Sequence, residues 1–397
     1  MIVTKTFRYR IYPTKEQQVL LAKHFGSKRF VYNHFLNERK SLYLKNKETL
    51  NYYDNAKSLT SLKQDEQYKW LNEINSQTLQ AALRDLDTAY NKFFRKQSRF
   101  PRFKAKRNKQ SFRVPQFVKY NDGELKIPKF KQPIKVNEDR PLTGKILFAT
   151  LSKKPSGKYF VSITVETEHI PYEKTDKQIG VDLGIKDLAI CSDGTKHSNI
   201  KTTKKHKRKL TYQQRQLSKK TKGSNNRWRQ RVIVARVHER ISNIRHNHLH
   251  QISSSIVREN QTICMESLSV INMMKNHCLA KSIADVSWGE LLRQIKYKSE
   301  WNERTFIQID RFFPSSKTCN KCKYIKDDLT LKDREWVCPS CSAELDRDVN
   351  AAENILEQGL KIHSGLGTKS ELKQKREEAS PLGESMSHET QPSLAVG

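Results

Sequence analysis

Four cysteines in the C-terminal quarter of the chain have the spacing of a metal site. They form two Cys-x-x-Cys pairs, Cys319 with Cys322 and Cys338 with Cys341, with fifteen residues between the pairs. This spacing matches a zinc ribbon, in which four thiolates complete a tetrahedron around a structural zinc ion. The ion would fold a short segment that has little core of its own. Four free thiols and an iron–sulfur cluster are the alternatives.

Carboxylates in unexpected places are the second chemical feature. Asp182 and Glu266 lie within apolar, strand-like stretches, where burial of an unpaired carboxylate is costly. Asp346 and Asp348 directly follow the cysteine segment, and either could cap the next helix. Taken singly, each could be a turn or cap residue. Together, three such groups could hold the two Mg²⁺ ions of a phosphodiester hydrolase.

The charge of the chain indicates the kind of partner. Lysine and arginine number 75 against 42 acidic residues, which gives a net charge of +33. Such an excess favours a phosphate backbone or an anionic membrane surface. The sequence has no apolar run of membrane-spanning length and no apolar core of a signal peptide at its N-terminus. We therefore expect a cytoplasmic protein, associated with the nucleoid when bound to DNA, with no membrane partner.

The expected compartment also bears on the cysteines. Inside a cell, paired Cys-x-x-Cys sequences favour metal binding over disulfide formation. The other three cysteines, Cys191, Cys264 and Cys278, are expected to act as ordinary small hydrophobic residues.

The N-terminal half alternates between two periodicities. Residues 5–12 alternate as a half-buried strand does, and a helical pattern follows from 14 to about 97. From 111 to 168 the period returns to two, with turn residues at 121–123 and 155–157. We expect a small β-barrel, completed by strand 5–12, with the helical block as an insertion.

The C-terminal half has a different order of elements. The pattern predicts strands at 179–184 and 188–191 and a third strand after the turn 192–194. A helix at 204–258, a strand at 261–268, a helix at 280–299 and a strand at 305–309 follow. After the cysteine insertion comes a final helix at 349–360. This is the order of an RNase H-like fold. The tail from 363 to 397 has low hydrophobicity and is expected to be disordered.

Two basic stretches are candidate nucleic-acid surfaces. Residues 91–113 hold ten basic residues, no acidic one and several phenylalanines, and residues 201–250 hold 16 basic residues against the single acid Glu239. Backbone contacts of this kind are independent of sequence, and aromatic rings can stack on unpaired bases. The candidate contacts are Arg102, Lys104, Lys106, Arg107, Lys207, Arg208, Arg229 and Arg231.

Several stretches together resemble a known family. They are the opening 5–13, Phe100-Pro101-Arg102-Phe103-Lys104, Gly180-Val181-Asp182-Leu183-Gly184, the Glu266 strand, Pro314–Cys319 and Asp346–Ile355. Over residues 3–360 the chain resembles TnpB, a transposon-encoded protein also called OrfB and related to the type V CRISPR effectors. One departure is visible, because Gln97-Ser98-Arg99 stands where a glycine is expected before Phe100.

The resemblance implies an RNA-guided, Mg²⁺-dependent DNA endonuclease. Its catalytic and magnesium-binding residues would be Asp182, Glu266 and Asp348, and the resemblance favours Asp348 over Asp346. It also implies one structural zinc ion, a guide RNA made from the end of the element, and double-stranded target DNA beside a short flanking motif. One RuvC site would cut both strands, and we expect a monomer.

The resemblance also gives names to the parts of an α/β multidomain chain. The expected parts are a wedge β-barrel at 1–12 and 112–176, a helical recognition domain at 13–111, an RNase H-like (RuvC) nuclease domain at 177–314 and 345–362, and a zinc-ribbon insertion at 315–344. Two other functions compete with a guided nuclease. One is a nucleic-acid-binding regulator or transposition accessory without cleavage, and the other is a strand-transferring transposase.

Overall fold

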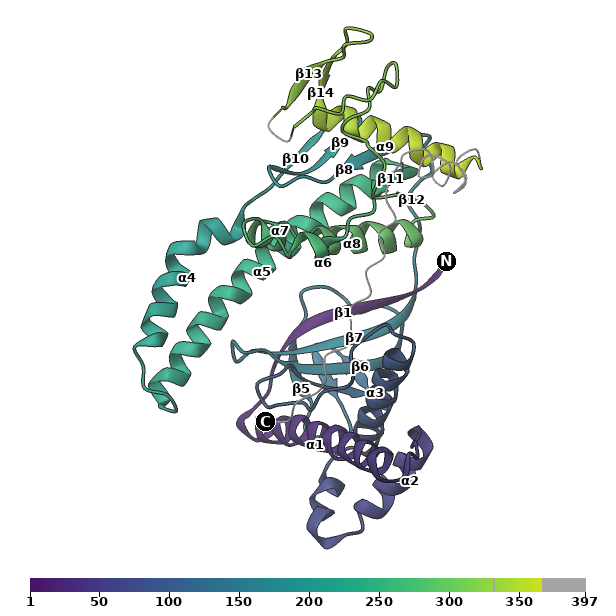
Figure 1. Ribbon diagram of the computed structural model, residues 1–397. Helices are drawn as coiled ribbons and strands as arrows, with labels where there is room; N and C mark the ends of the chain where they lie inside the picture. Colours follow the sequence, from purple (N-terminus) through teal and green to yellow (C-terminus); the bar gives the residue numbers. More distant parts are fainter. Residues whose placement is uncertain (331–332, 366–397) are drawn as a thin grey trace. The chain divides into compact units, whose positions relative to one another are not determined.

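The computed structural model describes residues 1–330 and 333–365, which form two compact units (Figure 1). The first unit contains Met1–Pro171 with Thr202–Ile244, and the second contains Tyr172–Lys201 with the described residues from Arg245 onward. Within these ranges no helix is long and apolar enough to cross a membrane. The tail predicted to be disordered lies outside the described residues from 366 onward.

A seven-stranded antiparallel sheet forms the centre of the first unit. Across the sheet the strands are β2 (Gln110–Val114), β6 (Lys145–Lys153), β7 (Tyr159–Glu168), β1 (Ile2–Tyr12), β5 (Ile134–Asn137), β4 (Glu124–Lys126) and β3 (Lys119–Asn121). β1 pairs with both β5 and β7, so the N-terminal strand is central. This confirms that strand 5–12 joins the later strands. Because β2 and β3 stand at the two ends of the order, closure into a barrel stays a prediction.

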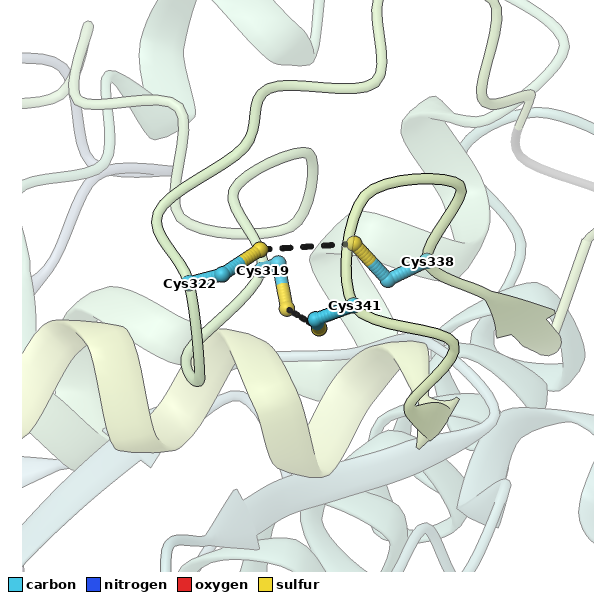
Figure 2. Close-up of side chains that lie close together, drawn as sticks. All are labelled: Cys319, Cys322, Cys338 and Cys341. Atoms are coloured by element: carbon cyan, nitrogen blue, oxygen red, sulfur yellow. Dashed lines mark hydrogen bonds between the residues drawn. The ribbon is translucent and has the colours of Figure 1, made fainter.

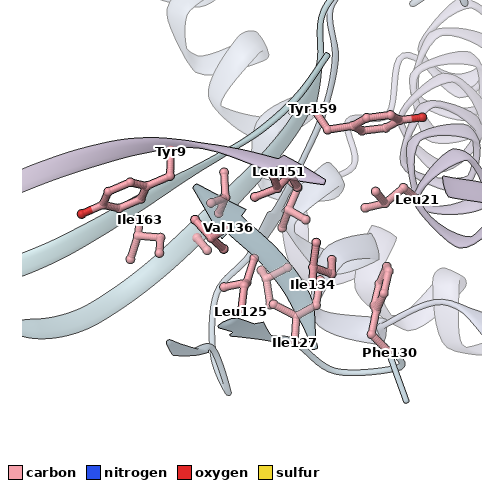
Figure 3. Close-up of a cluster of buried hydrophobic side chains, with 14 of the residues drawn as sticks. Tyr9, Leu21, Leu125, Ile127, Phe130, Ile134, Val136, Leu151, Tyr159 and Ile163 are labelled. Carbon is pink, nitrogen blue, oxygen red and sulfur yellow. The ribbon is translucent and has the colours of Figure 1, made fainter. Parts of the chain in front are cut away.

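The core of this sheet lies on one face. Successive strand side chains point to opposite faces, and Tyr9 of β1 shares a side with Ile163 of β7 (Figure 3). Ile11, two residues after Tyr9, belongs to the same cluster. Leu21 and Phe25 of helix α1 (Lys15–Asn46) pack against the same cluster. The helix begins at a capping box, in which Thr14 accepts from the backbone of Gln17 and the Gln17 side chain accepts from the backbone of Thr14. The N-terminal strand is thereby joined rigidly to the helical block.

The helical block predicted from 14 to about 97 is confirmed. After α1 come α2 (Tyr52–Leu62), a 3-10 helix (Glu66–Glu73) and α3 (Ser76–Phe94). Their apolar faces share a second core that includes Phe35, Leu71 and Leu83. Helices of this length are stable in water only when such a face is buried, so the block depends on this core.

The second basic stretch forms two helices where the sequence predicts one long helical region. α4 (Thr202–Ser218) and α5 (Asn225–Glu259) are separated by a turn with Gly223 at φ 87°. The residues of α5 up to Ile244 belong to the first unit. There Glu239, the one acid of this stretch, is buried and lies 3.0 Å from Lys158.

A five-stranded sheet forms the centre of the second unit. Its order is β10 (Lys196–Ser198), β9 (Asp187–Cys191), β8 (Gln178–Asp182), β11 (Thr262–Glu266) and β12 (Thr305–Ile309). β8, β9 and β10 are antiparallel, whereas β11 is parallel to both β8 and β12. The predicted strand at each of these positions is confirmed.

Helices cover both faces of this sheet. On one face, Ile179, Val181, Ile263 and Met265 pack with residues 249–257 of α5 and with α7 (Ala280–Val286) and α8 (Trp288–Trp301). The predicted helix 280–299 is divided at Ser287, whose φ of 61° interrupts it. The short α6 (Val270–Met273) precedes α7. On the other face, Cys264, Ile307 and Ile309 pack with Ile355 of α9 (Arg347–His363).

Two glycines allow α9 to approach the sheet closely. A Cβ atom on Gly180 of β8 would lie 2.0 Å from the carbonyl oxygen of Ala352, and one on Gly359 of α9 would lie 2.3 Å from Cys264 Sγ. Neither distance is possible for real atoms, so each site accepts only glycine at this helix-to-sheet separation. The glycines therefore fix α9 directly over β8 and β11.

Gly180→Ala is expected to destabilise the protein by about 1–3 kcal/mol, because the methyl group would push the α9 backbone away from the sheet. Gly289→Ala is the matched control, since a Cβ there meets no atom within 4 Å and alanine favours a helix by up to about 1 kcal/mol. Urea unfolding measures both changes. Equal stability of the two variants would contradict the close packing.

Candidate functional site

Two carboxylates end neighbouring parallel strands. β8 ends at Asp182 and β11 ends at Glu266. The register pairs Val181 with Met265, so the next residues, Asp182 and Glu266, lie side by side. Because strand side chains alternate, both acids point to the same face as Gly180 and Cys264, which is the face that α9 covers. Ligands of α/β folds bind at this carboxyl edge of the parallel strands.

Helix α9 brings a third carboxylate to that face. Asp346 is its N-cap and accepts hydrogen bonds from the backbone N–H groups of Asp348 (3.0 Å) and Val349 (3.1 Å). Its other carboxylate oxygen lies 2.6 Å from the Lys196 ammonium. Both of the oxygens of Asp346 are thus occupied by the cap and the ion pair. Asp348, in the first turn of the helix, is the acid whose charge acts on Asp182.

The two strand acids show the electrostatic effect of this crowding. Burial raises the pKa of Asp182 to about 6, and the negative charge of Asp348 adds to the shift. Burial also raises the pKa of Glu266 to about 7, with a further contribution from Asp182. Asp182 therefore links the three acids, because the charge of Asp348 acts on Asp182 and the charge of Asp182 acts on Glu266. Strongly raised carboxylate pKa values in one place are typical of functional sites, because the site needs positive charge to be stable.

Two arginines supply positive charge to Asp348. Arg334 and Arg347 each lie 2.8 Å from its carboxylate, one on each oxygen. Among the described residues, the three carboxylates do not form a group with all ligand oxygens within 4.8 Å. Asp348 is held toward the arginines instead. The donor set nevertheless fits a hard divalent cation, since it consists of carboxylate oxygens only.

The predicted metal ligands of the cysteine segment come together. Cys319 Sγ lies 3.7 Å from Cys341 Sγ, and Cys322 Sγ lies 3.5 Å from Cys338 Sγ (Figure 2). All four sulfur atoms lie within 4.8 Å of one another. A tetrahedral zinc site with Zn–S bonds of about 2.3 Å has sulfur–sulfur edges of about 3.8 Å. The cluster therefore has the size that zinc requires.

The segment around the cysteines has only a small core of its own. It consists of Cys319, Cys338, Trp336 and Leu345, with Leu329 and Ala343 partly buried against them. It contains the hairpin of β13 (Glu335–Val337) and β14 (Glu344–Asp346). β14 leads directly into α9, so the cysteine segment and Asp348 share a continuous stretch of backbone.

The remaining cysteines lie apart from this cluster. Cys191 and Cys264 are buried, as expected for small hydrophobic residues, whereas Cys278 is exposed. Cys278 lies between α6 and α7 and outside the cysteine cluster.

The candidate nucleic-acid contacts are mostly exposed. They lie on the loop between α3 and β2 (Arg102, Lys104, Lys106, Arg107), on α4 (Lys207, Arg208) and on α5 (Arg229, Arg231). Lys104 differs from the rest. Its ammonium lies 3.6 Å from the centre of the Tyr32 ring, its backbone is held by Asn33, and burial lowers its pKa. Its role is therefore at least partly structural.

The structure adds aromatic residues that the sequence analysis did not single out. Tyr212 on α4 is 58% exposed and Trp228 on α5 is 63% exposed, both among lysines and arginines. Exposed rings beside basic residues can stack on unpaired bases. The signal was present in the sequence, because Leu210 and Leu217 are the other apolar residues between 201 and 231.

Comparison with known families gives three matches. Residues 162–277 match the family OrfB_IS605, described as "Probable transposase", and residues 288–355 match the Cas12f1-like TNB domain. Residues 1–48 match the helix-turn-helix domain of OrfB_IS605 proteins. In this structure those residues form β1 and the single long helix α1.

Two relatives match nearly the whole chain. A Streptomyces pristinaespiralis protein named as an RNA-guided DNA endonuclease is 40% identical over 364 residues, 90% of this chain and 90% of its own. InsQ of Escherichia coli K12, named likewise, is 31% identical over 373 residues, 89% of this chain and 92% of its own. Among solved structures, the Cas12f1–sgRNA–target DNA complex matches with a TM-score of 0.57 at 13% identity, covering 89% of this chain and 98% of that chain. The chain thus has a Cas12f1-like fold.

Cys338→Ser is expected to lower the zinc content of the purified protein and to reduce the unfolding free energy, because the segment loses a ligand that substitutes for a core. Cys278→Ser is the matched control, since Cys278 is exposed and lies outside the cluster. Elemental analysis and thermal unfolding measure the two effects. Unchanged zinc stoichiometry in Cys338→Ser would refute the four-cysteine site.

Proposed function

Because the chain belongs to the transposon-encoded OrfB (TnpB) family of RNA-guided DNA endonucleases, we propose that it cuts double-stranded DNA under the direction of a guide RNA. The cleavage site is a single RuvC-type centre built from Asp182, Glu266 and Asp348. The observation that carries the proposal is the adjacency of Asp182 and Glu266 at the carboxyl edge of β8 and β11, together with the effect of the Asp348 charge on Asp182.

The order of the second sheet supports an RNase H-like nuclease domain. Three antiparallel strands are followed by two parallel ones, with the catalytic acids on the first and fourth strands and on the last helix. The seven-stranded sheet with its helical insertion corresponds to a wedge and a recognition domain. The domain boundaries predicted from the sequence are part of this proposal.

The three carboxylates would hold two Mg²⁺ ions. When bound, such ions activate water and stabilise the leaving oxygen of an in-line displacement. The charge of Asp348 acts on Asp182, and the charge of Asp182 acts on Glu266. Asp182 is therefore the acid that would bind both ions. Asp348 must give up part of its contact with Arg334 and Arg347 to join them. The released guanidinium groups would then be free to pair with a phosphate.

The cysteine cluster would hold one zinc ion in a structural role. Four protein thiolates leave no coordination position for water or substrate, so this ion has no part in the hydrolysis. Its contribution is to fold the segment that leads into α9.

The basic surfaces would bind the guide RNA and the target DNA. Exposed arginines and lysines on the α3–β2 loop and on α4 and α5 suit phosphate contacts, and Tyr212 and Trp228 suit stacking. In such a system base pairing reads most of the sequence, and the protein reads a short flanking motif. A regulator without cleavage would have no use for three carboxylates at one strand edge.

A plasmid-library cleavage assay tests this function. The protein is co-expressed with the DNA that flanks its gene, purified with any bound RNA, and given targets that match the RNA beside randomised flanks in Mg²⁺. Cuts that depend on the match and on one flanking motif are expected. Binding without cuts would favour the regulator, and joined products would favour a strand-transferring transposase.

Asp182→Asn is expected to lower the cleavage rate by more than about 100-fold, since loss of an outer-shell partner alone costs 10–100-fold. The unfolding free energy should rise by about 1–3 kcal/mol at pH 7, because the ionised carboxylate is disfavoured in the folded site. RNA binding should not change. Asp193→Asn, in an exposed turn of the same sheet, is the control. Full cleavage by Asp182→Asn would refute the site.

Asp348→Asn and Asp346→Asn form a matched pair that separates the two candidates in the last motif. Asp348→Asn is expected to abolish cleavage. Asp346→Asn should retain it, because asparagine caps a helix as well as aspartate and the lost ion pair to Lys196 is exposed. Rates measured on a matched linear target decide the matter. The reverse pattern would move the catalytic role to Asp346.

A further inference from the structure

The side chain of Asn350 lies against the backbone on both sides of a zinc-ligand cysteine. Its amide nitrogen donates to the Thr318 carbonyl oxygen (2.7 Å), and its amide oxygen accepts from the Asn320 N–H (2.9 Å). The residue between these two contacts is Cys319, which is fully buried. Asn350 therefore pairs with this backbone as a neighbouring strand would, and the pairing fixes the direction in which Cys319 points.

A second amide one helical turn further along α9 supports this contact. Asn354 donates to the carbonyl oxygens of Thr318 (2.6 Å) and Ser315 (2.9 Å). Asn350 is 2% exposed and Asn354 is 1% exposed. Loss of the Asn350 amide would remove the partner of the Asn320 N–H, and loss of the Asn354 amide would remove the donor to the Ser315 carbonyl oxygen. The Thr318 carbonyl oxygen would keep one donor in either case. A buried or partly buried group left unpaired is more costly than the loss of an exposed hydrogen bond.

The same helical turn carries the catalytic acid. Asn350 follows Asp348 by two residues, and the neighbouring Arg347 bonds both the Asp348 carboxylate (2.8 Å) and the Thr330 carbonyl oxygen (3.2 Å). The first turns of α9 are therefore attached to the cysteine segment by buried hydrogen bonds at Ser315, Thr318 and Asn320. The sheet holds the opposite face of the helix through Gly180 and Gly359.

We propose that Asn350 is a positioning residue that couples the cysteine cluster to Asp348, so that zinc bound at the cysteines strengthens divalent-cation binding at the carboxylates. The inference rests on the proposed function in that it takes Asp348 as a member of the cation site. The zinc ion would order the backbone at Cys319, and the Asn350 amide would transmit that order to the first turn of α9, which carries Asp348. Such coupling is reciprocal, so cations at the carboxylates also slow the loss of zinc.

Mn²⁺ binding to the full-length protein tests the coupling. Calorimetry gives the Mn²⁺ dissociation constant for zinc-loaded and zinc-depleted forms of the wild type, Asn350→Ala and Gln358→Ala. Gln358 lies on the same helix, two turns beyond Asn350, and is the matched control. Removal of zinc from the wild type is expected to raise the Mn²⁺ dissociation constant roughly 10-fold. Residues that hydrogen-bond to a metal ligand and orient it have effects of this size.

In Asn350→Ala, Mn²⁺ binding should already be weakened to that extent with zinc present, and depletion should change it little further. Zinc release to a chelator should be faster in Asn350→Ala than in Gln358→Ala. Mn²⁺ should slow the release from the wild type and from Gln358→Ala but not from Asn350→Ala. Equal Mn²⁺ affinity of the zinc-loaded and zinc-depleted wild type would overturn the proposal. Unaltered coupling in Asn350→Ala would overturn the role of Asn350.

Two further measurements keep these outcomes distinct. If Asn350→Ala does not fold, Asn350→Asp replaces it, since aspartate keeps the acceptor for Asn320 and loses the donor to Thr318. The Mn²⁺ titration of zinc-loaded Asp182→Asn tests the cation site itself. Loss of binding there, together with an uncoupled wild type, refutes the coupling and leaves the proposed function intact. Retained binding there refutes the proposed function.

Discussion

The candidate active site depends on how closely one helix can approach one sheet. Gly180 on β8 and Gly359 on α9 remove the side chains that would hold the two apart, and the α9 backbone takes their place. At this distance the first turn of α9 meets the carboxyl edge of β8 and β11. The charge of Asp348 then acts on Asp182, although the two residues lie 166 positions apart in the sequence. A larger residue at either glycine would push α9 away from the sheet and so displace Asp348 relative to Asp182 and Glu266.

Concentrated negative charge is the second constraint, and it is set within a strongly basic chain. Three acids gather at a half-buried edge, and burial together with mutual repulsion raises the pKa of two of them. Arg334 and Arg347 balance the third. Divalent cations and a phosphate backbone would exchange these partners, since cations pair with the carboxylates and the arginines can pair with phosphate. We therefore infer that the carboxylates and the arginines exchange partners when the substrate binds.

The sequence analysis predicted what periodicity and spacing encode. The Cys-x-x-Cys spacing anticipated the observed sulfur cluster, and the order of elements anticipated the five-stranded sheet. Acids within apolar strands marked Asp182 and Glu266 because such residues are otherwise costly. The similarity of the relatives confirms the family that the motifs suggested. The assignment of catalytic and cation-binding roles to individual residues stays a prediction.

Other features depend on contacts between distant residues, which spacing does not encode. The spacing alone left Asp346 and Asp348 open, because both acids suit a helix start. The resemblance favoured Asp348, and the cap bonds of Asp346 support that preference. The role of Asn350 depends on backbone groups 30 and 32 positions away. The interruptions of the predicted helices at Gly223 and Ser287 follow from local backbone conformation, and only the first has a glycine to indicate it.

A crystal of the full-length protein grown with Mn²⁺ would test the central claim most directly, because anomalous scattering locates the ions without reference to activity. The account predicts two manganese peaks at the carboxyl edge of β8 and β11, with Asp182 bound to both and Glu266 and Asp348 bound to one each. Asp348 would have turned away from at least one of its arginines. Peaks at Asp346, or an Asp348 that keeps both arginines while Mn²⁺ is bound elsewhere, would contradict the account.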